Sequence, residues 1–186
     1  MTIKQLLAIC ICVMAPVWVL AQECNDKIRA ATPMSRFTLH GDGTATDSRS
    51  GLRWQRCPVG YVFDDNATAN VYSDDKCELT GVAVFNWQSA LQSAADLNDG
   101  GGAAGFSDWR VPNLKELVSI LEFKCFGPAI NVSLFPDTPP VSFWSSTTTN
   151  SINNALVVNF ETAQNSFSYL DIAAFERHVR LVRGGG

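Results

Sequence analysis

The distribution of apolar and polar positions predicts one apolar leader and two amphipathic helices. Positions 6–20 are apolar apart from Cys10, Cys12 and Pro16. Further along, two stretches repeat apolar residues at helical spacing, namely Trp87, Ala90, Leu91 and Ala94, and then Leu114, Leu117, Val118 and Leu121. Asn86 and Asn113 stand where N-caps are expected, and Glu116 completes a capping box with Asn113. We therefore predict helices over 87–97 and from 114 to about 123–125.

The remaining apolar positions mostly alternate with polar ones, which is typical of short strands. Asp42-Gly43 predicts a hairpin turn between 36–40 and 44–47. Further strands are expected at 52–55, 143–146, 155–160, 165–170 and 177–183. Two helices and about seven strands indicate a single α+β domain. Three segments read as irregular loops, which are 58–80, 128–141 and 147–154.

The leader has the three parts of a signal peptide. Lys4 provides the charged region, the apolar stretch follows, and Val19-Leu20-Ala21 provides a small-residue cleavage signal. The apolar stretch is shorter than the roughly 20 residues that a membrane span needs. We predict a signal peptide at 1–21 and one domain at 22–186, exported to the periplasm, the outer surface or the medium, without a membrane span.

Four cysteines follow the predicted cleavage site, and an even number in an exported chain indicates two disulfides. Four cysteines allow three pairings. Cys57 and Cys77 bracket a polar segment, so we predict that they close it and that Cys24 pairs with Cys125.

Charge and motifs narrow the classes of function. Removal of the leader leaves 13 basic and 18 acidic side chains, a net charge of −5. A nucleic-acid-binding role is disfavoured because phosphates require clustered Lys and Arg. His40 and His178 lie outside metal-ligand and nucleophile motifs, and paired cysteines supply no thiol. We expect no catalytic residues, no metal and no cofactor.

Several short motifs occur in an order that resembles the Lcl C-terminal domain family. They are Asp42-Gly43-Thr44-x-Thr46-Asp47, Gly51-Leu52-x-Trp54, Gly105-Phe106-x-Asp108-Trp109-Arg110-Val111-Pro112-Asn113, Phe143-Trp144-Ser145-Ser146 and Val179-Arg180-Leu181-Val182-Arg183. The resemblance runs from about Cys24 to the end. It implies an exported bacterial protein with a C-type-lectin-like fold.

The family takes its name from the C-terminal domain of a Legionella collagen-like adhesin. In that adhesin the domain trimerises and binds sulfated glycosaminoglycans. This chain departs from it in lacking a Gly-x-y collagen tract and in being acidic, which disfavours sulfated polyanions. The resemblance supplies no catalytic residues.

The expected function is therefore a non-catalytic binding or adhesion module that recognises glycans or a protein surface, either as a single chain or as an oligomer. The alternatives are an enzyme on a lectin-like scaffold and a structural subunit of a surface assembly. We assign scaffold roles to Asp108, Trp109, Arg110, Glu116 and Arg180. The candidate ligand contacts are Thr147, Thr148, Thr149, Asn150, Asn153 and Trp144. Segments 58–80 and 128–141 are further candidates because binding residues concentrate on loops held by a rigid scaffold.

Overall fold

The computed structural model describes residues 21–66, 68, 71–150, 154–169 and 175–184, with the backbone alone for 165–169. All but the last residue of the predicted leader lies outside the described part. The described elements are two α-helices, one short 3₁₀ helix and eleven strands, which confirms the α+β class. Within the described ranges, no helix is long and apolar enough to cross a bilayer.

A four-stranded antiparallel sheet joins the last strand of the domain to three strands near its N-terminal end. Its order is β11-β4-β3-β2, with β2 at Phe37–His40, β3 at Thr44–Asp47, β4 at Arg53–Gln55 and β11 at Val182–Arg183. The 3₁₀ helix η1 (Met34–Arg36) leads into β2. The hairpin predicted around Asp42-Gly43 is confirmed, because Phe37 pairs with Asp47 and His40 with Thr44.

The predicted last strand is mostly wrong. Of the residues 177–183, only 182–183 belong to β11, while Arg177 and His178 form isolated bridges. Between His178 and β11, the backbone carbonyls and the Arg180 side chain bond to other parts of the domain. The carbonyls of Val179 and Leu181 accept hydrogen bonds from Val59 and Gln55, and the Arg180 side chain is fully buried.

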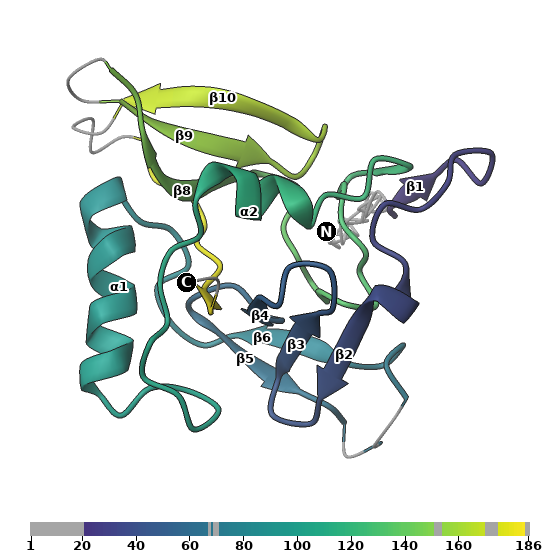
Figure 1. The fold of residues 1–186 in the computed structure, drawn as a ribbon, viewed down its shortest axis with the longest axis horizontal. Coiled ribbons are helices and arrows are strands. Elements are labelled where there is room, and N and C mark those ends of the chain that lie inside the picture. The colour runs from purple at the N-terminus through teal and green to yellow at the C-terminus, as the bar shows by residue number, and fades with distance from the viewer. Residues whose placement is uncertain (1–20, 67, 69–70, 151–153, 170–174, 185–186) are drawn as a thin grey trace, which may run out of the picture.

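A three-stranded antiparallel sheet, β10-β9-β8, lies beside α2 (Figure 1). It comprises β8 (Ser142–Thr148), β9 (Asn154–Asn159) and β10 (Gln164–Tyr169). Alternate side chains divide the core into two clusters. Phe143 and Val158 belong to the cluster with α2, whereas Trp144 and Val157 belong to the cluster with α1.

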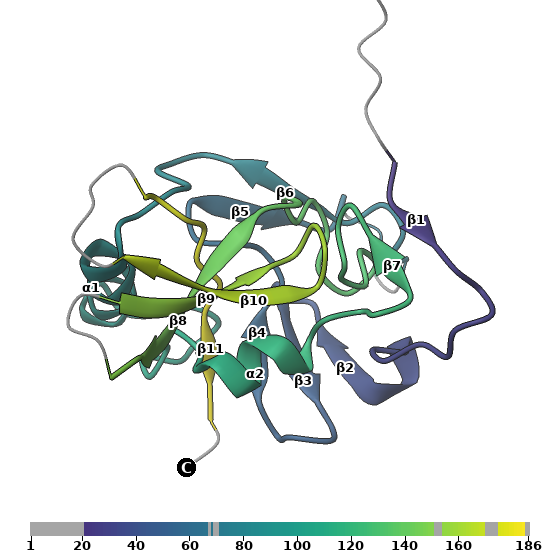
Figure 2. The same ribbon diagram turned by 90° about the horizontal axis from the view of Figure 1, so that it is seen from above.

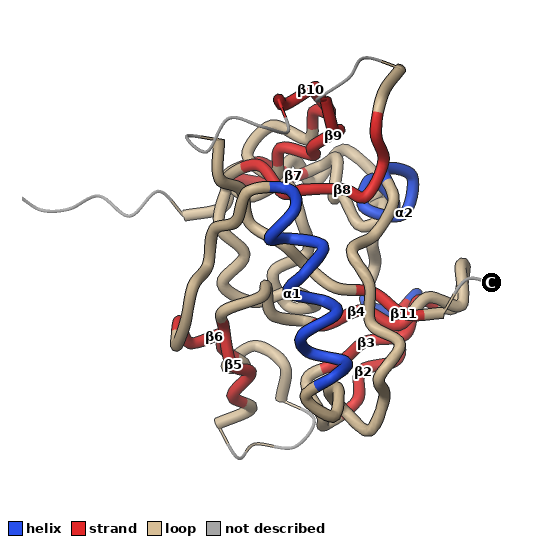
Figure 3. The backbone as a smooth tube through the Cα atoms, turned by 90° about the vertical axis from the view of Figure 1, so that its left-hand side faces the viewer, coloured by secondary structure: helices blue, strands red, loops and turns tan. Residues whose placement is uncertain are grey.

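Both predicted helix starts are confirmed. α1 (Trp87–Asp99) is capped by the Asn86 side chain, and it lies along one side of the molecule between the levels of β8 and the four-stranded sheet (Figure 3). α2 (Leu114–Ser119) begins with the capping box of Asn113 and Glu116. Its predicted end is wrong. The helix stops at Ser119 because the next residues pair elsewhere, with Leu121 bridging Ile130 and the Glu122 N–H donating to the carbonyl of Ala129.

Two small sheets were not expected, and each contains or adjoins a disulfide. β1 (Glu23–Cys24) pairs with β7 (Cys125–Phe126), and this ribbon lies at the end of the molecule opposite α1 (Figure 2). β5 (Tyr61–Asp64) pairs with β6 (Lys76–Leu79) inside the segment that was expected to be a loop. Both predicted disulfides, Cys24–Cys125 and Cys57–Cys77, are confirmed.

Candidate functional site

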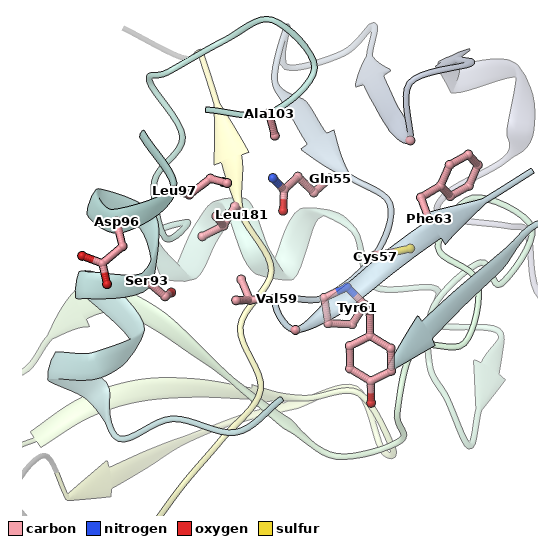
Figure 4. A pocket seen from close by; sticks show the side chains of 13 residues that line it. Gln55, Cys57, Val59, Tyr61, Phe63, Ser93, Asp96, Leu97, Ala103 and Leu181 are labelled. Atoms are coloured by element: carbon pink, nitrogen blue, oxygen red, sulfur yellow. The ribbon is translucent and has the colours of Figure 1, made fainter. Parts of the chain in front are cut away.

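A pocket of about 530 Å³ opens between α1, β5 and the end of β4 (Figure 4). We call it the α1–β5 pocket. Ser93 and Leu97 project into it from α1, Val59 and Tyr61 line it from the chain around β5, and Leu181 closes it from the approach to β11. Its volume is within the range of about 300–1,000 Å³ that small-molecule sites occupy.

The wall around Gly60 depends on the absence of a side chain there. Gly60 has φ of 88°, a left-handed conformation that L side chains rarely adopt. A Cβ at this position would lie 2.1 Å from the carbonyl oxygen of Val82. The Gly60 carbonyl in turn accepts hydrogen bonds from the N–H groups of Thr80 and Gly81. This close approach fixes the 80–82 chain against the pocket wall.

Phe63 is positioned by two contacts from opposite directions. Gly43 lies so close that a Cβ there would be 2.9 Å from the Cβ of Phe63. The guanidinium carbon of Arg56 lies 4.7 Å from the centre of the Phe63 ring. Arg56 is buried and forms an ion pair with Asp75 at 2.6 Å. The Phe63 ring therefore packs on the Arg56 guanidinium, whose charge is neutralised by Asp75.

Few polar side chains face the pocket. The Gln55 amide lies near its centre, and the Ser93 hydroxyl donates to the Ala90 carbonyl of its own helix at 2.8 Å. Asp96 is exposed at the outer edge, where it accepts a hydrogen bond from Gln92. Among the lining residues Asp96 alone is charged. The pocket therefore suits an apolar group that makes a small number of hydrogen bonds.

Arg180 lies in the core behind this region. Its guanidinium donates to the carbonyls of Gln55 and Arg56 and, at 2.7 Å, to the hydroxyl of Thr138. It also stacks at 4.8 Å from the Phe135 ring. Burial, together with the nearby charge of Arg56, lowers the pKa of Arg180 to about 9. These contacts connect the end of β4, segment 128–141 and the approach to β11.

The other predicted scaffold residues make contacts of the same kind near α2. Arg110 binds Glu116 through two hydrogen bonds of 2.8 and 2.7 Å. Burial alone would raise the pKa of Glu116, but hydrogen bonds from Arg110 and Asn113 outweigh it and lower that pKa. Asp108 forms an ion pair with Arg183 at 2.6 Å. These pairs attach the loop before α2 to the closing strand.

Trp109 belongs to the core beside the same loop. Its ring is only 2% exposed, and its indole N–H donates to the carbonyl of Ala103 at 3.0 Å. The side chain of Asn98 accepts from the backbone N–H of Trp109 and donates to its carbonyl. Trp109 thus joins the end of α1 to the chain that leads into α2.

The predicted ligand contacts that the structure describes, namely Trp144, Thr147, Thr148, Thr149 and Asn150, do not line the pocket. Trp144 is fully buried and its indole N–H donates to the Phe85 carbonyl, which corrects its assignment as a surface contact. The Thr147 hydroxyl accepts the Leu114 N–H at the start of α2. Thr148 pairs with Ala155 in the sheet, and the Thr149 N–H donates to the Asn154 carbonyl. Asn150 is exposed, and Asn153 lies outside the described residues.

Segment 128–141, the second candidate loop, is irregular as predicted but supplies no residue to the pocket. Ala129, Ile130, Leu134 and Phe135 are fully buried in the α2 cluster. Segment 58–80, by contrast, supplies five residues to the α1–β5 pocket. The sequence signal that could have found this wall is the Tyr61-Val62-Phe63 run inside an otherwise polar segment. The contributions of α1, Gln55 and Leu181 had no such signal, because they meet only in the folded chain.

The ionisable groups of the described chain are engaged mostly in structural contacts. Burial alone would raise the pKa values of Asp47 and Glu122, but hydrogen bonds from neighbouring groups lower them. Burial, followed by the charge of Arg180, lowers the pKa of His178. Within the described ranges, no three His, Cys, Asp or Glu side chains are placed to hold a metal ion.

The sequence matches the model of a known protein family. The model of the family described as the Lcl C-terminal domain matches residues 43–183. No curated protein matches the chain in sequence. The matched range includes all of α1, β5, β6 and α2. It also contains every residue that lines the pocket, from Gly43 to Leu181.

Proposed function

Because the chain belongs to the Lcl C-terminal domain family, we propose that it is an exported, non-catalytic binding module with a role in adhesion. Its ligand occupies the α1–β5 pocket. The family description points to a surface adhesin-related module, and the two disulfides are consistent with an oxidising compartment. In this proposal the α+β domain has a C-type-lectin-like fold.

The pocket is the observation that carries the proposal. It combines mainly apolar walls with a few polar groups, which is the usual composition of a ligand site. Its walls are rigid because the Cys57–Cys77 disulfide and the close contact at Gly60 fix the chain on one side, while α1 fixes the other. A rigid site loses less conformational entropy on binding than a mobile one.

The state of the carboxylates favours binding over catalysis. An acid–base catalyst needs a carboxyl group whose pKa is raised and which can reach a substrate. Asp47, Glu116 and Glu122 have lowered pKa values and accept hydrogen bonds from structural partners. None of the three lines the pocket. Their contacts support a scaffold that presents a binding surface.

A substitution that fills the pocket tests this proposal. Ser93 points into the pocket from α1, so the Ser93→Phe variant places a ring where the ligand would lie. Gln88→Phe adds the same ring at an exposed position of α1 that does not line the pocket. The wild-type protein, purified after export, is screened against a glycan array and a panel of cell-surface and matrix proteins. Binding that is found should weaken at least about tenfold in Ser93→Phe and persist in Gln88→Phe.

The screen can also contradict the proposal. Unchanged affinity in a folded Ser93→Phe variant would show that the ligand does not bind in the α1–β5 pocket. Chemical conversion of an arrayed glycan or protein by the wild-type domain would show that the module is an enzyme.

A further inference from the structure

The hydrogen-bonding groups of the α1–β5 pocket are too few for a sugar. A sugar ring carries a hydroxyl on most of its carbons, and each hydroxyl that is buried without a partner opposes binding. The deep part of the pocket offers the Gln55 amide and a Ser93 hydroxyl that already donates to Ala90, while the Tyr61 hydroxyl points away from both Gln55 and Leu97. Asp96 is available only at the outer edge. An apolar side chain would enter the same space without leaving polar groups unpaired.

The surface next to the pocket is unusually apolar. Leu79 and Val82 are 60 and 67% exposed. Leu79 pairs directly with the pocket residue Tyr61, so these two side chains lie on the same face of the β5–β6 hairpin. The backbone of Val82 packs on Gly60 in the pocket wall. A rim of this kind is typical of a protein-binding surface, where large apolar side chains surround a pocket that receives an anchor residue.

The one charged residue that lines the pocket is the acidic Asp96. Asp137 is exposed beside the β5–β6 hairpin, where its Oδ2 accepts the Cys77 N–H at 2.8 Å. Burial and the charge of Asp137 raise the pKa of the pocket residue Tyr61. Arg56, whose guanidinium contacts the Phe63 ring of the wall, is buried and paired with Asp75. A partner with a positive charge at the rim is therefore favoured.

We infer that the pocket is the anchor site for a protein partner. The partner inserts one large apolar side chain between Leu97 and Val59 and places a neighbouring basic side chain near Asp96. This inference rests on the proposed function, since it names the partner class for the same pocket. It makes a protein surface, rather than a glycan, the ligand of the module.

The test uses small probes and the ¹⁵N-labelled protein in NMR titrations. The probes are acetyl-Phe-Lys-amide, acetyl-Phe-Glu-amide, acetyl-Ser-Lys-amide and methyl glycosides of common hexoses. We expect acetyl-Phe-Lys-amide to shift the amide signals of Leu97 and Ala103 saturably. Acetyl-Phe-Glu-amide should bind about threefold more weakly or worse, because its charge faces Asp96. The serine dipeptide and the glycosides should give no saturable shift at the same concentration.

Two matched variants assign the charge preference. Asp96→Asn should make the lysine and glutamate probes bind about equally. Asp99→Asn should leave the preference unchanged, because Asp99 is also exposed on α1 but does not line the pocket. A preference that persists in Asp96→Asn would overturn the assignment of the rim charge.

The outcomes separate the two proposals. Saturable shifts at the pocket with glycosides but not with the phenylalanine dipeptides would overturn this inference and leave the pocket as the binding site. If neither class of probe shifts a pocket signal, and Ser93→Phe does not weaken binding to the ligand found by the screen, both proposals are wrong.

Discussion

Segments 58–80 and 128–141 are both irregular in sequence, the first closed by Cys57–Cys77 and the second restricted by its prolines. In the folded chain they have opposite roles. Segment 128–141 directs Ile130, Leu134 and Phe135 into the core, where all three are fully buried. Segment 58–80 forms a β-hairpin and leaves Val62 and Leu79 more than half exposed.

The difference arises from what each segment packs against. Phe135 has the Phe37 ring at 6.0 Å on one side and the Arg180 guanidinium at 4.8 Å on the other. Tyr61 instead faces an open pocket, with the tilted ring of His178 as its aromatic neighbour at 6.3 Å. A restricted loop is therefore no sign of a binding site by itself. Apolar side chains that lack a second packing partner are the better sign.

The largest expected effect is at Phe135. Phe135→Ala should lower the free energy of unfolding by about 3–5 kcal/mol, because it leaves a cavity in the core. Chemical denaturation followed by tryptophan fluorescence measures this change. Val132→Ala is the control in the same segment, and it should cost less than about 0.5 kcal/mol since Val132 is 37% exposed. Equal losses in the two variants would show that segment 128–141 is not part of the core.

Loss of the disulfide in segment 58–80 should have the next largest effect. The Cys57→Ala/Cys77→Ala double variant opens a connection of 20 residues, which is worth about 3 kcal/mol in the chain-entropy model. The core cluster around Phe135 should survive, whereas the pocket wall at Tyr61 should become mobile. Hydrogen exchange measured by mass spectrometry distinguishes the two regions. Faster exchange in 128–141 than in 58–80 would show that the disulfide stabilises the core segment more than the pocket wall.

Acid should weaken the buried side of the molecule through Glu122. Glu122 is 2% exposed, and its backbone N–H binds segment 128–141 at Ala129. Its carboxylate accepts the N–H groups of Ala31 and Thr32, both at 2.9 Å. These bonds lower its folded-state pKa in spite of burial. The stability that Glu122 supplies is therefore present above the unfolded pKa of 4.5 and is lost as the pH falls through the folded pKa.

The Glu122→Gln variant tests that assignment. At pH 7 it should lower the free energy of unfolding by about 2 kcal/mol, since bonds to a charged acceptor are lost. The deficit relative to wild type should shrink below pH 4.5 as the wild-type carboxylate becomes protonated. Denaturation series at pH 7, 5, 4 and 3 measure it. A deficit that stays constant across the series would show that Glu122 does not titrate with folding.

Local signals in the sequence predicted the elements that local interactions determine. Asn86 and Asn113 cap the two helices, and Asp42-Gly43 turns the first hairpin, because each motif acts within about four residues. The end of α2 was not predictable in this way. It depends on Leu121 meeting Ile130, and no local breaker stands at Ser119.

The site was predictable only in part, for the same reason. Segment 58–80 was a candidate, but the pocket exists because Ser93 of α1 and Leu181 of the C-terminal chain meet it across the fold. Trp144 was wrongly assigned to the ligand site, because the sequence of a strand does not show which of its two faces is directed at the core. The register of β8 with β9 turns it into the α1 cluster.

The last and smallest expected effect concerns the polar segment 147–154, which could either bind the ligand or stabilise the fold. Thr147 tests which of these roles it has. Its hydroxyl accepts the Leu114 N–H at 2.9 Å, and that N–H is one of the first in α2, which have no partner within the helix. Thr147→Ala should therefore lower the free energy of unfolding by about 1 kcal/mol, the usual cost of a lost cap. Thr148→Ala, next to it and exposed, should have no measurable effect. Both variants should keep full affinity for the ligand found by the screen, because neither residue lines the pocket. Loss of affinity in Thr148→Ala, without loss of stability, would return the ligand site to this segment and leave the α1–β5 pocket without its proposed role.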